Sequence, residues 1–341
     1  PNCGAYLTFD PDSQQWKCPF CSSAFPETEL KGKAEAFQKE ADKEAEQSSG
    51  AQVVYHCPSC GSEIMTDETT VATHCYYCHS PVVLQGKLTA DMKPDEVLPF
   101  TIGKEKAIEE ITEWIRTRKF VPKKFFSKAQ IQEMSVVYYP HFVSECQTEG
   151  VLDGEATTSD VFDEGKYVVT NTRHYHVRRE GRFVFKDILR PALSKANRKL
   201  TEGVHPFPLE DAKPFSGAFL SGFLAERRDL EADSYRQEIE QELQGYMNSM
   251  LQDTASQYQT CSANTTAAVK KIKTKYVLLP TWVLTYPNKK NKDEPYYYVM
   301  NGCTGQVCGK LPVDMGRLWR HGLLAGLIVA ALYCVLAYFL F

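Results

Sequence analysis

The sequence predicts an α+β fold with two small cysteine-rich modules, a body of helices and antiparallel sheet, and a C-terminal helix. Cysteines cluster in two short runs near the N-terminus, apolar residues in the middle alternate between helical and strand spacing, and the last twenty residues carry no charge. The predicted organisation is a first module at 1–25, a charged linker at 26–52, a second module at 53–90, a body at 95–312 and a helix at 322–341.

The two cysteine runs are copies of one motif. Residues 57–78 read CPSCGSEIMTDETTVATHCYYC, and a shift by 57 positions aligns this run with the start of the chain. The position that matches Cys57 falls directly before Pro1, so we expect a cysteine immediately upstream. The matched pairs are Cys60 with Cys3, Cys75 with Cys18, and Cys78 with Cys21.

The spacing within each unit indicates zinc. Two CxxC pairs separated by fourteen residues are typical of four-cysteine sites, in which four thiolates at about 2.3 Å form a tetrahedral shell. Gly4 and Gly61 follow a cysteine and permit a tight turn around the metal, whereas Ser22 and His79 hold the matching places in the second pairs. We therefore predict two zinc ribbons in the full-length protein, with the ligands Cys3, Cys18, Cys21, Cys57, Cys60, Cys75 and Cys78.

Two alternatives to zinc remain for these cysteines. They could be free or disulfide-bonded thiols, but two units in identical register argue against that. CYYCH at 75–79 also matches the haem-attachment string. Haem would leave Cys57 and Cys60 unexplained and would require export.

The C-terminal segment predicts a transmembrane helix. GLLAGLIVAALYCVLAYFLF at 322–341 would cover about 30 Å as a helix, which matches the hydrocarbon thickness of a bilayer. A buried core helix is the alternative. Arg317 and Arg320 precede the segment, so we expect a location in the cell membrane, with one span or more and the N-terminal bulk in the cytoplasm.

The remaining composition indicates a soluble globular part with no global preference for nucleic acid. The chain has 341 residues, 43% hydrophobic residues and a formal net charge of -4. The linker is rich in Ala, Glu and Lys and is typical of a solvated helical spacer. We therefore expect the two ribbons to be independent heads.

The body combines helix and strand patterns. Ile108, Ile111 and Ile115 lie on one face of a predicted helix over 104–120, and SKAQ at 127–130 predicts the start of a short second helix. Turn signals at 153–154 and 180–181 divide the following strands, SVVYYPHFVS, KYVVTNTRHYHV and GRFVFKDI. A long helix is expected from about 233 to 258, followed by the strands KYVLLPTWVLTY, PYYYVM and TGQVCGKL.

A fainter repeat suggests an internal duplication of the body. A shift by 140 residues aligns VVYYPHFV with YVLLPTWV and places Pro140 on Pro280. Chance similarity between apolar strands is the alternative. Proline within both runs predicts edge or bulged strands.

No arrangement of nucleophile, base or phosphate-binding loop is recognisable in the body, so we expect a protein that is not an enzyme, with neither catalytic nor cofactor-binding residues apart from the zinc ligands. His174 and His176 alternate on one strand and could bind metal, but surface histidines are the simpler interpretation. Cys303 and Cys308 lack redox-pair spacing, so we expect free thiols. The basic segment RTRKFVPKKFFSK at 116–128 could contact phosphates, an acidic protein face or only solvent.

The strings CPSCG, CYYC, DETTVATHCYYCHSPVVLQGKL, LSGFLAE, YVLLPTWVLTY and MNGCTGQVCGKLPV together resemble bacterial membrane-anchored proteins with a TFIIB-type zinc ribbon. The resemblance covers nearly the whole chain and carries no settled biochemical activity. It implies an adaptor in a membrane-stress complex, because family members are often encoded beside phage-shock-type and SPFH-type proteins. Cys303 and Cys308 depart from the family pattern.

The sequence is therefore compatible with two alternative functions. The first is a membrane-anchored zinc-ribbon scaffold that binds cytoplasmic or membrane proteins as well as the lipid bilayer. The second is a membrane-tethered protein whose ribbons bind nucleic acid. The second is disfavoured because the loop between Cys60 and Cys75 holds acidic residues and neither lysine nor arginine.

Overall fold

The computed structural model describes Cys3 and residues 6–30, 53–56, 63–66, 69–74, 81–83, 92–122, 134–286 and 296–340. Of the described residues, 43% lie in strands and 28% in helices. A small three-stranded sheet contains β1 (Thr8–Asp10), β2 (Gln15–Lys17) and β3 (Ala24–Phe25), and a two-stranded sheet contains β4 (Val53–His56) and β5 (Glu63–Thr66).

The third sheet has ten strands and forms the body. Its central path runs β11-β8-β13-β9-β12-β6-β7, while β10 pairs with β9, and β14 pairs with β13 and β15. The strands are β6 (Thr70–His74), β7 (Pro81–Val83), β8 (Glu96–Val97), β9 (Ser135–Glu164), β10 (Tyr167–Pro191), β11 (Lys213–Pro214), β12 (Leu224–Glu226), β13 (Thr260–Tyr286), β14 (Tyr296–Asn301) and β15 (Val307–Gly309).

The fold-class prediction needs correction, because the described chain is mostly sheet and the body sheet is mixed. Strand β12 pairs with β9 in parallel, and β13 pairs with β8 in parallel, whereas the other pairs are antiparallel. The helices are α2 (Lys104–Arg116), α4 (Arg198–Glu202), α5 (Arg236–Asp253) and α6 (Met315–Leu340), with 3-10 turns η3 (Leu209–Asp211), η4 (Gly217–Leu220) and η5 (Ala232–Tyr235).

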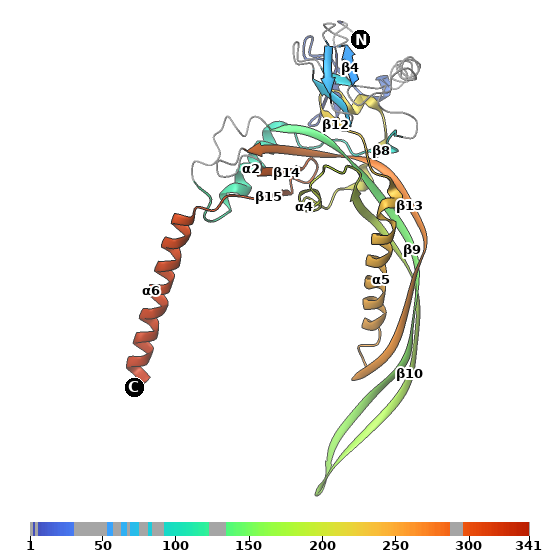
Figure 1. The fold of residues 1–341 in the computed structure, drawn as a ribbon, viewed down its shortest axis with the longest axis vertical. Helices are drawn as coiled ribbons and strands as arrows, with labels where there is room; N and C mark the ends of the chain where they lie inside the picture. The colour runs from blue at the N-terminus through green and yellow to red at the C-terminus, as the bar shows by residue number, and fades with distance from the viewer. Residues whose placement is uncertain are drawn as a thin grey trace.

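Strands β9, β10 and β13 extend far beyond the body as a curved arm, with α5 lying against one face (Figure 1). We call residues 144–186 and 260–275, together with α5, the arm. Leu152, Val177 and Leu251 are buried between the strands and the helix. Strands β9 and β10 meet at a tight turn in which Gly165 has a φ of 64°, a conformation that glycine adopts without strain.

The turns predicted at 153–154 and 180–181 are wrong, because β9 and β10 run through both positions. Gly154 permits close approach of β13: a Cβ atom on this residue would lie 2.3 Å from the Cα atom of Ala263. Glycine inside a strand pattern therefore marked close packing here and not a chain reversal.

Pro140 and Pro280 lie in the two central strands of the body and not in edge strands. On the side of β9 away from β13, the partner is β12 at residues 137–138 and β10 from His141 onward. On the side of β13 away from β9, the partner is β8 at residues 277–278 and β14 from Thr281 onward. Each proline thus lies where one neighbouring strand replaces another, so its missing N–H group removes no ladder bond.

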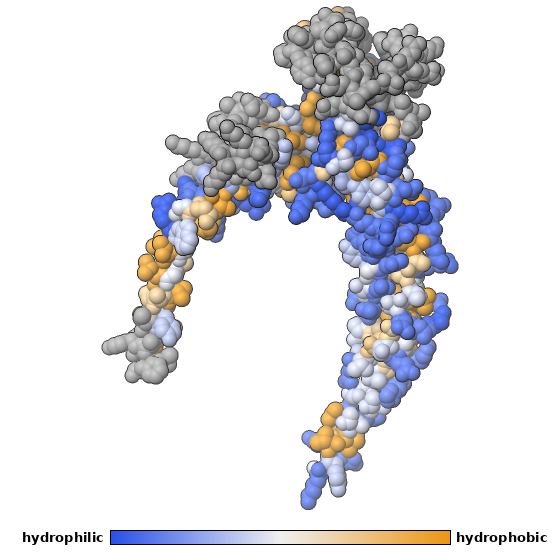
Figure 2. All heavy atoms as spheres, in the orientation of Figure 1, coloured by the Kyte–Doolittle hydropathy of each residue, from blue (hydrophilic) through white to orange (hydrophobic). Residues whose placement is uncertain are grey.

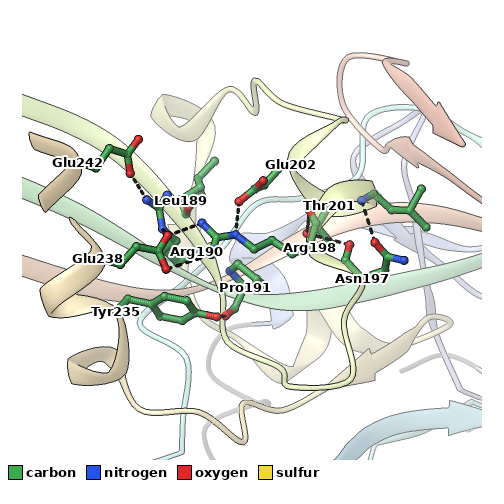
Figure 3. A network of polar contacts seen from close by, with 11 residues as sticks. Leu189, Arg190, Pro191, Asn197, Arg198, Thr201, Glu202, Tyr235, Glu238 and Glu242 are labelled. Atoms are coloured by element: carbon green, nitrogen blue, oxygen red, sulfur yellow. Dashed lines mark hydrogen bonds and ion pairs between the residues drawn. The ribbon is translucent and has the colours of Figure 1, made fainter. Parts of the chain in front are cut away.

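The network in Figure 3 joins α5 to the end of β10 and to α4, at the base of the arm. The Arg190 side chain is 9% exposed, and its Nε lies 3.2 Å from Glu238 Oε1 while its Nη2 bonds with Glu242. Arg198 bonds with Glu202 and Glu238 and so adds the α4 segment to the network. These contacts fix the orientation of α5 relative to the sheet.

Helix α6 covers most of the segment predicted to span a membrane, and Asp314 Oδ1 accepts a hydrogen bond from Arg317 N at 3.1 Å at its start. No helix in the described part of the chain is long and apolar enough to cross a membrane. The transmembrane part of the fold prediction is therefore contradicted.

Candidate metal centre

The first ribbon is a three-stranded sheet whose last two strands are joined by a cysteine turn. Cys18 follows β2, and Cys21 lies three residues later. The turn is closed by hydrogen bonds from Cys18 N to Ser23 O and from Ser22 N to Cys18 O, both at 2.9 Å. Ser22 has a φ of 57°, so it adopts the left-handed conformation for which glycine would be more favourable.

The thiols of Cys3, Cys18 and Cys21 form a group that could hold a metal ion. Their three Sγ atoms lie within 4.8 Å of one another, and Cys3 Sγ is 3.5 Å from Cys18 Sγ. Sulfur atoms at 2.3 Å from a tetrahedral zinc ion are about 3.8 Å apart, so the group fits such an ion after small adjustments. Three thiols leave one of the four tetrahedral positions to a further ligand.

The electrostatic environment favours the thiolate at Cys21. Hydrogen bonding with Ser23, whose Oγ lies 3.3 Å from Cys21 Sγ, lowers the pKa of the Cys21 thiol to about 6, and the thiols of Cys18 and Cys3 add to this effect. Thiolate is the form that binds metal. Cys18 is buried, whereas Cys3 and Cys21 are exposed, so the group opens towards solvent on one side.

The ribbon is packed into the core of the body and is not an independent head. Phe9 and Trp16, on adjacent strands of the ribbon, both contact Phe219 of η4, with ring centroids 5.4 and 5.1 Å apart. Trp16 Nε1 donates a hydrogen bond to Ala218 O at 2.8 Å, and Phe9 N donates to Ser221 O at 3.1 Å. The position of the thiol group is therefore fixed by the body as well as by the ribbon.

The second ribbon is partly described. Its four predicted ligands, Cys57, Cys60, Cys75 and Cys78, lie outside the described residues, as do the CYYCH string and Gly61. Strand β6 lies between its two cysteine pairs and joins the body sheet by pairing with β12. Val71 and Ala72 are fully buried there, so this ribbon also contributes to the body.

The other predicted candidates do not assemble into a site. His176 Nε2 lies 3.2 Å from Asp153 Oδ1 on the exposed face of the arm, whereas the thiols of the other candidate pair, Cys303 and Cys308, are free. Burial raises the pKa of Cys303 to about 12 and also raises that of Cys308, so neither is a reactive thiolate.

In the described part of the basic segment, residues 116–122, both arginines contact side chains of α2. The guanidinium of Arg118 lies 5.1 Å from the ring centroid of Trp114, and Arg116 is 3.8 Å from a carboxylate oxygen of Glu113. Its lysines at 123, 124 and 128 lie outside the described residues.

Sequence reasoning missed two polar residues in the body. Asn301 is fully buried, and its amide donates to Val204 O and Pro206 O while its Oδ1 accepts from Cys303 N and Thr304 N. His141 is buried near the start of β9. A histidine within an apolar strand was the only available signal for it.

Comparison with known proteins finds a likeness to a protein that is itself uncharacterized. The chain is similar to the uncharacterized protein YdjG of Bacillus subtilis (strain 168), with 27% identity over 251 residues, which is 73% of each chain. No family model matches the chain, and no solved structure matches it.

Proposed function

We propose that this protein is a metal-stabilised adaptor that binds other proteins through its arm. The observation that carries the proposal is the arm itself, which projects from the body and leaves most of β10 exposed (Figure 1). Long exposed strands of this kind are suited to binding and have no evident role in stabilising the body. Proteins of the phage-shock and SPFH types are the candidate partners that the family resemblance implies.

Zinc is the proposed metal, bound by Cys3, Cys18 and Cys21, with a second site formed by the four cysteines of the second ribbon. A bound ion supplies a rigid cross-link between the start of the chain and the cysteine turn. Phe9 and Trp16 extend from the same ribbon into the body core. The proposed role of the metal is therefore to hold the ribbon against the body, and it is structural and not catalytic.

The alternative of nucleic-acid binding by the ribbons has less support. Asp10 and Asp12 lie on the first ribbon, and its lysine, Lys17, is already paired with Asp10 at 2.5 Å. This local charge would repel phosphate.

Elemental analysis of the full-length protein tests the metal. We expect about two equivalents of zinc, from the four-thiolate stoichiometry of each ribbon. Cys18→Ser should remove about one equivalent, whereas Cys261→Ser, at an exposed thiol of β13, should remove none. Equal zinc content in all three proteins would contradict the assignment.

Photo-crosslinking in cells tests the adaptor role. A crosslinking residue at Val184, which is 56% exposed on the arm, should capture protein partners. The same residue at Glu105, exposed on α2, is the matched control. Adducts to nucleic acid in place of protein, or equal protein adducts at both positions, would refute the proposal.

A further inference from the structure

Strand β10 has one unpaired edge. It pairs with β9 along its whole length, and no other strand in the described part of the chain pairs with it. From Tyr167 to Lys186 its residues are exposed or half-buried, with the exception of Val177 beneath α5. Figure 1 shows this strand running along the arm towards its tip.

The direction of the backbone groups can be deduced from β9. Gln259, directly before β13, donates through its backbone N to Thr157 O, and its side-chain amide bonds with both N and O of Ser159. Odd-numbered residues of β9 therefore point towards β13, and even-numbered ones point towards β10. Their partners in β10 are odd-numbered, as Thr158 opposite Arg173 illustrates.

It follows that the even-numbered residues of β10 direct their N–H and C=O groups to the open edge. A second contact agrees with this assignment, because Arg178 O accepts a hydrogen bond from the side chain of Arg179 at 3.1 Å. The outward-pointing positions are Thr172, His174, His176, Arg178, Glu180, Arg182 and Val184.

The edge is also basic. Between residues 172 and 186, β10 carries four arginines and a lysine but one acidic residue, Glu180. Strand β9 supplies a carboxylate directly opposite two of these arginines, since Arg178 lies 3.3 Å from Asp153 and Arg182 lies 3.1 Å from Glu149. Arg178 also donates through Nε and Nη2 to Glu180 of its own strand. Both arginine side chains remain at least 60% exposed, so their remaining N–H donors face solvent.

These charges decide between occupants. Charged residues on an edge strand discourage uncontrolled pairing, which is their ordinary role. A second copy of the chain would place arginines of one β10 beside those of the other, and like charges across a strand pair are destabilising. An acidic strand added at the open edge would instead place carboxylates opposite the arginines of β10, as β9 does on the other side of the strand.

We propose that the open edge of β10 binds an extended, acidic segment of a partner protein by strand addition. The inference deepens the proposed adaptor function and rests on it. Main-chain hydrogen bonds from the even-numbered positions provide the binding surface, and Arg178 and Arg182 select carboxylates at alternate positions of the added strand.

A synthetic peptide of about ten residues that alternates glutamate with valine and threonine is the probe, and the same peptide with lysine is its control. Fluorescence anisotropy with the full chain should show binding of the acidic peptide and at least about tenfold weaker binding of the basic one. His174→Pro removes an outward N–H and should weaken binding by about tenfold, whereas His174→Ala keeps that N–H and should change it by less than about twofold.

Amide hydrogen exchange provides a readout that needs no variant. Addition of the acidic peptide should slow exchange at the even-numbered residues from 174 to 182 and leave the odd-numbered ones unchanged. Equal binding of both peptides, or protection confined to odd-numbered residues, would overturn the edge assignment. If photo-crosslinking at Val184 still captured proteins in that case, the adaptor function would stand and strand addition alone would fail.

Discussion

The burial of His141 should make the stability of the body depend on pH. This residue lies in β9 between Pro191 of β10 and Val277 of β13 and is 2% exposed. Its Nδ1 lies 3.2 Å from Tyr139 O, and since a carbonyl can only accept, Nδ1 carries the proton in the neutral ring. Nε2 has no hydrogen-bond partner among the described residues. A second proton would have to enter at this buried atom.

The magnitude follows from the shift in pKa. The pKa of His141 is lowered from 6.5 to about 4, chiefly by burial; the hydrogen bond with the Tyr139 carbonyl opposes this shift, and the nearby His205 adds a smaller lowering effect. Above pH 6.5 the ring is neutral in the folded and unfolded chains. Between pH 6.5 and 4 the unfolded chain binds the proton and the folded chain does not, so stability falls by about 1.4 kcal/mol per pH unit, and by about 3 kcal/mol in total.

Urea unfolding of the full chain at pH 7 and pH 5, followed by circular dichroism, measures this effect. From pH 7 to pH 5 the His141 contribution should be a loss of about 2 kcal/mol. His141→Gln should lack this loss, whereas His174→Gln, at an exposed position of β10, should keep it. The comparison is between pH values for each protein, so it does not depend on how much the glutamine itself destabilises the fold. Equal pH dependence in His141→Gln and the unmodified protein would refute the reasoning.

Two further predictions concern packing and charge, and both are measured as changes in the free energy of unfolding at pH 7. Gly154→Ala places a Cβ atom 2.3 Å from the Cα atom of Ala263 and should destabilise the arm by about 2 kcal/mol, whereas Gly245→Ala, with open space around it in α5, should stabilise by about 0.5 kcal/mol. Effects of the same sign would contradict the packing argument. Arg190→Met leaves Glu242 without its buried partner and should cost about 1–3 kcal/mol, whereas Arg236→Met, in an exposed pair on α5, should cost less than about 0.5 kcal/mol. Similar losses for both variants would show that burial of Arg190 does not matter.

Sequence reasoning succeeded where the signal was local. The spacing of Cys3, Cys18 and Cys21 predicted a shared site, and their thiols do lie together. The helices predicted at 104–120 and at about 233–258 correspond to α2 and α5, which end earlier than predicted, because an apolar stripe reports the existence of a helix better than its ends.

It failed where one residue type serves two purposes. Glycine permits both turns and close approach of strands, and only tertiary structure shows that Gly154 serves the second purpose and Gly165 the first. Proline in a strand indicated an edge, yet Pro140 and Pro280 lie in central strands at points where the neighbouring strand changes. Such exchanges of strand partners are long-range features that no local pattern encodes.

The placement of the first ribbon connects the metal site with the rest of the molecule. A short metal-binding module has little apolar surface of its own, and here Phe9 and Trp16 are buried against Phe219 of the body. Binding of a metal ion by these thiols would therefore be coupled to this packing and to that of Phe223, which contacts Phe9 as well as the core residues Phe100 and Tyr138. Because the same core includes Phe142 and Tyr276, at the base of the strands that form the arm, loss of the metal should loosen the support from which the arm projects. Metal binding and partner binding would then depend on one core, even though the thiols and the open edge of β10 lie in different parts of the fold.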